Sequence, residues 1–175
     1  MNRDLTAHHE DGHAVATLLR GGGELLSITI EPTDDYLGRT GSRTKAVASG
    51  DRMFVTFAGP WAEARTQWPL TSVDGEDDAG ATFDDYLCGA WLVNADGDSD
   101  AYEGMRVEDL KDRMLLAEHL DITPGELRER QERGWGDELE HAWPVIQQVA
   151  KLLLAGDTVT DAVVRDLVDG MWGDA

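Results

Sequence analysis

The chain has 175 residues, 41% of them hydrophobic, and its 35 Asp and Glu against 15 Lys and Arg give a formal net charge of −20. This length supports a substantial buried core and predicts a single domain over residues 1–175. The strong negative charge argues against binding to nucleic acid or to an anionic membrane surface, because both need a basic patch.

The sequence contains no recognisable targeting or membrane segment. Its N-terminus lacks the apolar run of a secretory signal, and no stretch reaches the ~20 apolar residues that span a bilayer. The single cysteine, Cys88, excludes an intrachain disulfide, which is compatible with a reducing compartment. These features predict a cytoplasmic protein.

The first half of the chain predicts helices around a small β element. Leu5, Val15 and Leu18 recur at helical spacing after Asp4, a suitable N-cap, whereas residues 25–31, after the glycines at 21–23, are rich in β-branched side chains. In chain order, we expect a helix over 4–20, strands over 25–31 and 36–48, and helices over 52–67 and 82–93.

Helices dominate the second half. Thr123 and Glu126 flank Pro124 in a capping-box pattern, which is typical of the start of a helix. In chain order, we expect helices over 100–119, 124–134, 138–155 and 160–171. The predicted fold class is therefore mainly α with a small β element (α+β).

The first predicted helix contains an H-E-x-x-H motif, formed by His9, Glu10 and His13. Residues at i and i+4 lie on one helical face, so both imidazoles can reach one ion, and zinc accepts imidazole nitrogen. Glu10 follows the first ligand and can take a proton from the attacking water. A chain of this composition contains the motif by chance roughly 0.01 times, so the motif indicates a zinc site.

Two histidines leave a catalytic zinc site short of the three protein ligands that it usually has. Spacing alone does not choose the third ligand, because the chain has 35 acidic residues. The candidates are Glu63 on the second predicted helix, Asp96, Asp98 and Asp100 before the long helical half, and the less suitably placed His119 and His141.

Several segments, in the same order along the chain, resemble the peptidase domain of FtsH-type ATP-dependent zinc metalloproteases. Residues 5–15 resemble the active-site helix of that family, whose usual form is H-E-A-G-H-A. The other similar segments are 28–32 followed by the L-G-x-T segment at 37–40, the A-G-x-x-A-E segment within 57–63, and the helical run 138–169. The resemblance spans most of the chain and is weakest in the middle.

The resemblance implies a mostly helical domain whose active-site helix packs near a short β element. In the family the third zinc ligand is an aspartate that opens a later helix, which points to Asp100, with Asp98 as the near rival. Glu10 would be the catalytic base. The residues along the substrate cleft would be Leu37, Gly38, Arg39 and Thr40.

The sequence departs from the family in three respects. Asp11 stands where the family has Ala, and residues 69–97 are longer and more acidic than the corresponding loop. Neither the G-x-x-x-x-G-K-[ST] loop of an ATPase nor a membrane anchor occurs in the sequence. We therefore expect a stand-alone peptidase domain, without ATP-driven unfolding of its substrates.

Two functions remain open from the sequence. The first is a zinc metalloendopeptidase with His9, His13 and Asp100 as ligands. It would hydrolyse peptide bonds in unfolded or flexible polypeptide segments, which are either already unstructured or delivered by a partner. The alternative is a non-catalytic binding or regulatory protein on a metallopeptidase scaffold, whose acidic surface engages a basic protein. Glu10 favours the enzyme, because a scaffold alone does not need the base.

Overall fold

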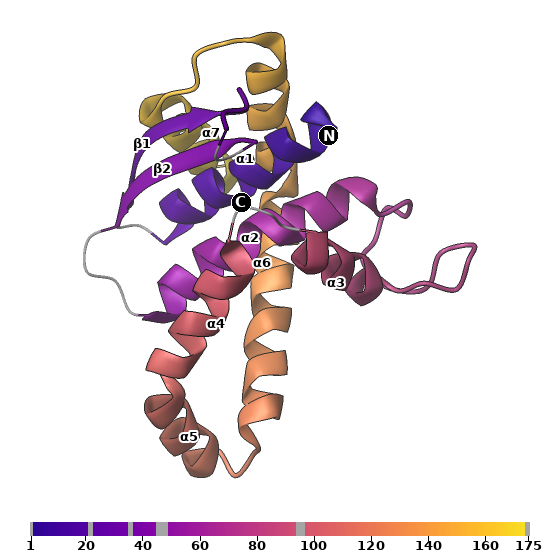
Figure 1. The fold of residues 1–175 in the computed structure, drawn as a ribbon, viewed down its shortest axis with the longest axis vertical. Coiled ribbons are helices and arrows are strands. Elements are labelled where there is room, and N and C mark those ends of the chain that lie inside the picture. Colours follow the sequence, from indigo (N-terminus) through magenta and orange to yellow (C-terminus); the bar gives the residue numbers. More distant parts are fainter. Residues whose placement is uncertain (1, 21–22, 35–36, 45–48, 94–96, 174–175) are drawn as a thin grey trace.

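The computed structural model describes residues 2–20, 23–34, 37–44, 49–93 and 97–173. In chain order, its elements are α1 (Arg3–Leu19), β1 (Gly23–Thr29), β2 (Arg39–Thr44), α2 (Ser49–Gln67), α3 (Phe83–Val93), α4 (Asp98–Glu108), α5 (Leu110–His119), α6 (Pro124–Ala155) and α7 (Asp161–Gly173). The described residues are mainly helical with one small antiparallel sheet, which confirms the predicted fold class (Figure 1). Among them, no helix combines the length and the apolar character needed to cross a bilayer.

The sheet consists of β1 and β2, which lie against α1 (Figure 1). The two strands are antiparallel, with Gly23 opposite Thr44 and Thr29 opposite Arg39, and the register shifts after Leu25. Leu25 is 5% exposed and belongs to the hydrophobic core, and Ile28 packs against that core, so β1 contacts the helices through these two side chains. This packing brings the start of β2 beside the helix that carries the H-E-x-x-H motif.

Helices α1 and α2 pack so closely that their backbones meet at Gly12. A Cβ at Gly12 would lie 2.3 Å from the Ala58 carbonyl oxygen and 2.9 Å from the Ala62 Cβ, so any side chain there would push the helices apart. Glycine in a helix interior costs about 1 kcal/mol relative to alanine. The close approach of α2 explains why α1 carries a glycine at this position.

Helix α6 is one continuous helix, so the prediction of two helices over 124–134 and 138–155 was wrong. Trp135, between the two predicted segments, is buried with its ring centroid 5.7 Å from that of Phe57. This packing outweighs the low helix propensity of the glycines that flank the tryptophan. The predicted capping box is confirmed, because Thr123 accepts from the Glu126 N–H and the Glu126 side chain accepts from the Thr123 N–H.

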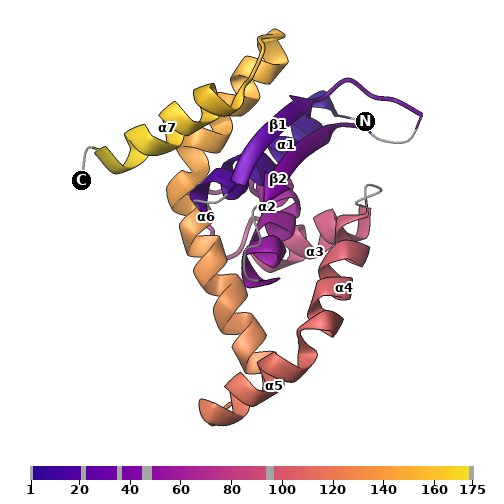
Figure 2. The same ribbon diagram turned by 90° about the vertical axis from the view of Figure 1, so that its left-hand side faces the viewer.

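The single helix expected over 100–119 is instead two helices, α4 and α5, which meet at Asp109. Together with the first half of α6 they form a V-shaped arm, with α5 at its far end (Figure 2). Tyr102 on α4 links the two sides of the arm, because its hydroxyl donates to the carboxylate of Glu132 on α6 at 2.7 Å.

The N-cap of α1 is Asn2 rather than the expected Asp4.

Candidate metal centre

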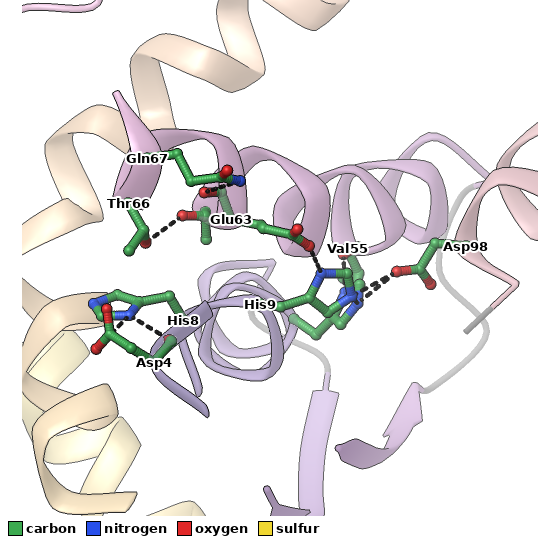
Figure 3. A network of polar contacts seen from close by, with 10 residues as sticks. Asp4, His8, His9, Val55, Glu63, Thr66, Gln67 and Asp98 are labelled. Atoms are coloured by element: carbon green, nitrogen blue, oxygen red, sulfur yellow. Dashed lines mark hydrogen bonds and ion pairs between the residues drawn. The ribbon is translucent and has the colours of Figure 1, made fainter. Parts of the chain in front are cut away.

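The histidines of the motif lie on a face of α1 that the rest of the fold covers. His9 is 5% exposed and Glu10 is 3% exposed, because the sheet and α2 pack over this part of the helix. The neighbouring His8 points away from them: its Nδ1 donates to the Asp4 carbonyl oxygen, and its ring packs against Trp143 (Figure 3). The structure therefore separates His8 from the motif's two histidines.

Asp98, the first residue of α4, brings a carboxylate to both histidines of the motif (Figure 3). Its Oδ2 lies 3.0 Å from the His9 Nε2 and 2.9 Å from the His13 Nε2, and the two nitrogens are 3.2 Å apart. Donor atoms of these three residues all lie within 4.8 Å of one another. This group could hold a metal ion.

The other ring nitrogen of each histidine is engaged by an oxygen atom. The His9 Nδ1 donates to Glu63 Oε2 at 3.2 Å, and the His13 Nδ1 donates to the Val55 carbonyl oxygen at 2.7 Å. Such bonds fix the ring orientation and turn Nε2 of each ring toward Asp98, an arrangement typical of metal-binding histidines. Both acceptors belong to α2, so the second helix orients the ligands of the first.

Gly59 on α2 leaves the space that the two imidazoles occupy. A Cβ at this residue would lie 2.3 Å from the His13 Nε2 and 2.9 Å from the His9 Nε2. Any other amino acid would displace the rings. Gly59 therefore belongs to the site even though it supplies no ligand atom.

The carboxylates of Glu10, Glu63 and Asp98 lie near the histidines and favour positive charge at this site. Burial lowers the pKa of His9, but hydrogen bonds to Asp98 and Glu63, with further attraction from Glu10, outweigh it and raise the pKa to about 10. Burial likewise lowers the pKa of His13, and the charge of Asp98 reverses the shift. Burial raises the pKa of Asp98, yet the two histidines hold it below its usual range. The same negative surroundings would attract a metal cation.

Glu10 lies beside this group, against the start of β2. Thr40 Oγ1 donates to the Glu10 carboxylate at 2.7 Å and to the Glu10 backbone carbonyl oxygen at 2.9 Å. A Cβ at Gly38 would lie 2.8 Å from the Glu10 Cγ, so only glycine leaves room for this side chain. The segment expected to lie along a substrate cleft thus contacts the expected base through two of its residues. Of the other two, Leu37 is half-buried and Arg39 is exposed.

The structure places the expected third ligand, Asp100, outside the group. Asp100 is exposed on the first turn of α4, whereas Asp98, named as the near rival, joins the histidines. Two residues along a helix correspond to a rotation of about 200°, so when Asp98 faces α1 its neighbour Asp100 faces away. Glu63 contacts His9 at the nitrogen that does not face Asp98, which matches an orienting role rather than that of a ligand.

The remaining candidate ligands do not reach the site or cannot be placed. His119 and His141 are exposed and lie outside the group formed by the described residues. Asp96 lies outside the described residues.

Sequence reasoning missed the Val55 carbonyl, which no side-chain pattern can reveal, and Gly59, whose only signal was its place in the A-G-x-x-A-E segment.

Asp11, which stands where the resembling family has alanine, is fully buried on α1. Neither of its carboxylate oxygens has a hydrogen-bond partner among the described residues. Burial, together with the nearby charge of Glu10, raises the pKa of Asp11 well above its usual value. Burying a polar group without a hydrogen-bond partner lowers the free energy of unfolding, so Asp11 destabilises the fold at this position of α1.

Two imidazole nitrogens and one carboxylate oxygen converge from two helices, with the second nitrogen of each ring already bonded, and this donor set fits a metal ion. Comparisons with models of protein families, with curated proteins and with solved structures found no significant match to this chain.

Proposed function

We propose that this chain is a zinc-dependent metallopeptidase, related to the peptidase domain of FtsH-type proteases, that hydrolyses peptide bonds in flexible polypeptide segments. The observation that carries the proposal is the convergence of His9, His13 and Asp98 with Glu10 directly after the first histidine. Two imidazoles, one carboxylate and an adjacent glutamate are the parts that a catalytic zinc site of this type requires.

His9 and His13 would hold zinc through Nε2, and Asp98 through Oδ2. When bound, zinc supplies a Lewis acid that polarises the scissile carbonyl and acidifies water. Glu10 would accept the proton of the attacking water and pass it to the leaving amine nitrogen. Thr40 supports this role, because its hydroxyl holds the Glu10 carboxylate in place at 2.7 Å before any substrate arrives.

The substrate class follows from the surroundings of Glu10. The segment from Leu37 to Thr40 runs beside the base, and we propose that an extended polypeptide lies along it. Glu10 is 3% exposed, so we expect the substrate to be an extended chain that is already unstructured or is presented by a delivery partner. We place this activity in the cytoplasm.

The proposal is tested by replacing Glu10 with glutamine in the zinc-loaded protein. Glu10→Gln keeps the shape of the side chain and removes its basicity, so we expect zinc content to stay at one per chain while hydrolysis of an unfolded polypeptide falls by about 10²–10⁴-fold. Zinc content is measured by metal analysis of the purified protein, and hydrolysis by the release of new amino termini. Equal cleavage by the variant and the parent would contradict the proposal.

The ligand assignment has a matched pair of variants on the same helical turn. Asp98→Ala should lose zinc, because it removes the carboxylate that faces both histidines. Asp100→Ala removes an exposed carboxylate from α4 and should keep zinc. The opposite result would restore Asp100 as the ligand, and zinc loss with Glu63→Gln alone would assign that position to Glu63.

The net charge of −20 favours a second candidate function, a non-catalytic protein that binds a basic partner through its acidic surface. Such binding would weaken steeply with salt. A salt-sensitive complex with a cationic protein, together with no hydrolysis by the zinc-loaded chain, would favour this function over the peptidase.

A further inference from the structure

An apolar patch covers α5 and the end of α4, at the far end of the arm. It is formed by Val107, Leu110, Met114 and Leu115, which are 65%, 50%, 54% and 55% exposed. The four residues present on the order of 400 Å² to solvent, which is within the range of about 300–600 Å² of the largest apolar patch on a typical soluble monomer. Only Arg113 and Ala117 of α5 are buried.

The patch lies along an open groove of about 640 Å³, whose lining also includes Lys111, Glu118 and Ile122. Four of the lining residues, at positions 111, 114, 115 and 118, follow the helical spacing within α5 and share one face of that helix, and Val107 adjoins them from the end of α4. Glu108, at the end of α4, also lines the groove, and the face of α5 is an apolar stripe that carries one lysine and one glutamate. It therefore combines apolar area with charges of both signs.

We propose that two copies of this chain associate through this face, with their α5 helices antiparallel. Lys111 and Glu118 are equally far from the midpoint between Met114 and Leu115. A two-fold axis through that midpoint places Lys111 of each copy opposite Glu118 of the other copy and buries Met114 against Leu115. The symmetric contact is self-complementary in charge as well as in apolar surface.

The area is sufficient for a weak dimer. Two patches with their polar rims would bury roughly 1,000 Å² in total, which is near the lower limit for a specific interface. The net charge of −20 on each copy opposes association, but at physiological salt the charges are screened beyond about 8 Å. We therefore expect a dissociation constant on the order of 10 µM.

The interface leaves the candidate metal centre free. Asp98 begins α4 beside α1 and α2, whereas both views place α5 at the opposite end of the arm (Figures 1 and 2). Zinc content should therefore be the same in the monomer and in the dimer. Loss of self-association would not affect the proposed peptidase activity, so the two proposals can fail independently.

Sedimentation velocity of the full chain over a range of concentrations tests the proposal. Leu115→Glu should weaken association by about 100-fold or more, because the dimer would bury two carboxylates at its centre. Leu92→Glu is the matched control: Leu92 is 81% exposed on α3, outside the patch, and its replacement adds the same charge. Equal dimers from all three proteins, or a parent that is monomeric throughout, would overturn the proposal.

Charge reversal tests the antiparallel arrangement directly. Lys111→Glu and Glu118→Lys should each weaken association by about tenfold, because each places like charges opposite one another twice in the dimer. The double variant restores two opposite-charge pairs and should recover the parent's dissociation constant. Both residues are exposed, so circular dichroism should be unchanged in every variant. A double variant weaker than either single one would overturn the arrangement.

Discussion

Glu63 and the Val55 carbonyl determine which nitrogen each histidine turns toward Asp98. Both accept from Nδ1, so the two Nε2 atoms converge on one carboxylate oxygen. A histidine without such a partner can rotate its ring or change its tautomer, and a ligand loses affinity when it does. The α2 helix therefore contributes to metal binding without providing a ligand.

We predict that Glu63→Ala lowers the affinity for zinc by about 10–100-fold, the usual effect of removing an orienting partner from a ligating histidine. Glu63→Gln keeps an oxygen that can accept from the His9 Nδ1, so its loss should be smaller. Competition for zinc with a chromogenic chelator measures both constants. Parent-like affinity of the alanine variant would show that this hydrogen bond has no part in binding.

Asp11 is the opposite case, a buried carboxyl group that has no hydrogen-bond partner among the described residues. Asp11→Ala should raise the free energy of unfolding by about 1–3 kcal/mol, because it removes the cost of burying that group. Asp161→Ala is the contrasting variant: its carboxylate accepts from the Leu25 N–H and from Arg165, so its removal should lower stability. Urea unfolding at neutral pH with a chelator present separates these effects from metal binding. A destabilised Asp11→Ala would mean that the carboxyl group has a stabilising contact.

At the scale of elements, the site depends on how closely α1 approaches α2. Gly12 allows the backbones to meet, and Gly59 allows both imidazoles to lie against α2. The strand β2 closes the other side of α1, where Thr40 contacts Glu10. Ligands, base and orienting groups are thus positioned by one helix pair and one strand.

We predict that Gly12→Ala lowers the free energy of unfolding by about 1–3 kcal/mol, because its Cβ would overlap the Ala58 carbonyl oxygen at 2.3 Å and overpacking costs energy of this order. Gly134→Ala in α6 is the matched control. Apart from its chain neighbours and the backbone of its own helix, no atom of the described part of the chain lies within 4 Å of the Cβ that it adds, so it should gain about 1 kcal/mol from helix propensity alone. Chemical unfolding of both variants tests the prediction, and equal shifts in the two would contradict the close approach.

At the scale of the whole molecule, the candidate ligands join two distant parts of the chain. His9 and His13 belong to the N-terminal helix, and Asp98 opens the arm formed by α4, α5 and the first half of α6. An ion bound by all three would hold the arm against the rest of the fold. Metal binding and stability should therefore be linked.

We predict that zinc raises the thermal midpoint of the chain and that a chelator lowers it. A ligand that binds only the folded state at 100 times its dissociation constant adds about 2.7 kcal/mol to stability. Asp98→Ala should abolish the zinc-dependent shift, and Asp100→Ala should keep it. Differential scanning calorimetry with and without zinc measures the shift, and a midpoint that does not respond to zinc would argue against a metal held by the folded chain.

Local patterns predicted most of the elements correctly. Helical periodicity located α1, α2 and α7, and the capping box of Thr123 and Glu126 marked the start of α6. The errors arose where packing overrides local preference. Trp135 holds α6 continuous between two glycines because its ring is buried against α2, and nothing local in the sequence records that contact.

The sequence by itself determined the pair of histidines and the adjacent glutamate, because the spacing of four residues brings His9 and His13 together on any helix. The tertiary structure decided the rest of the site. Asp98 and Asp100 are two residues apart and chemically identical, so only the way α4 begins against α1 and α2 selects which carboxylate faces the histidines. That choice is a long-range contact, formed 85 residues beyond His13, and it depends on the packing of the whole fold rather than on any local pattern.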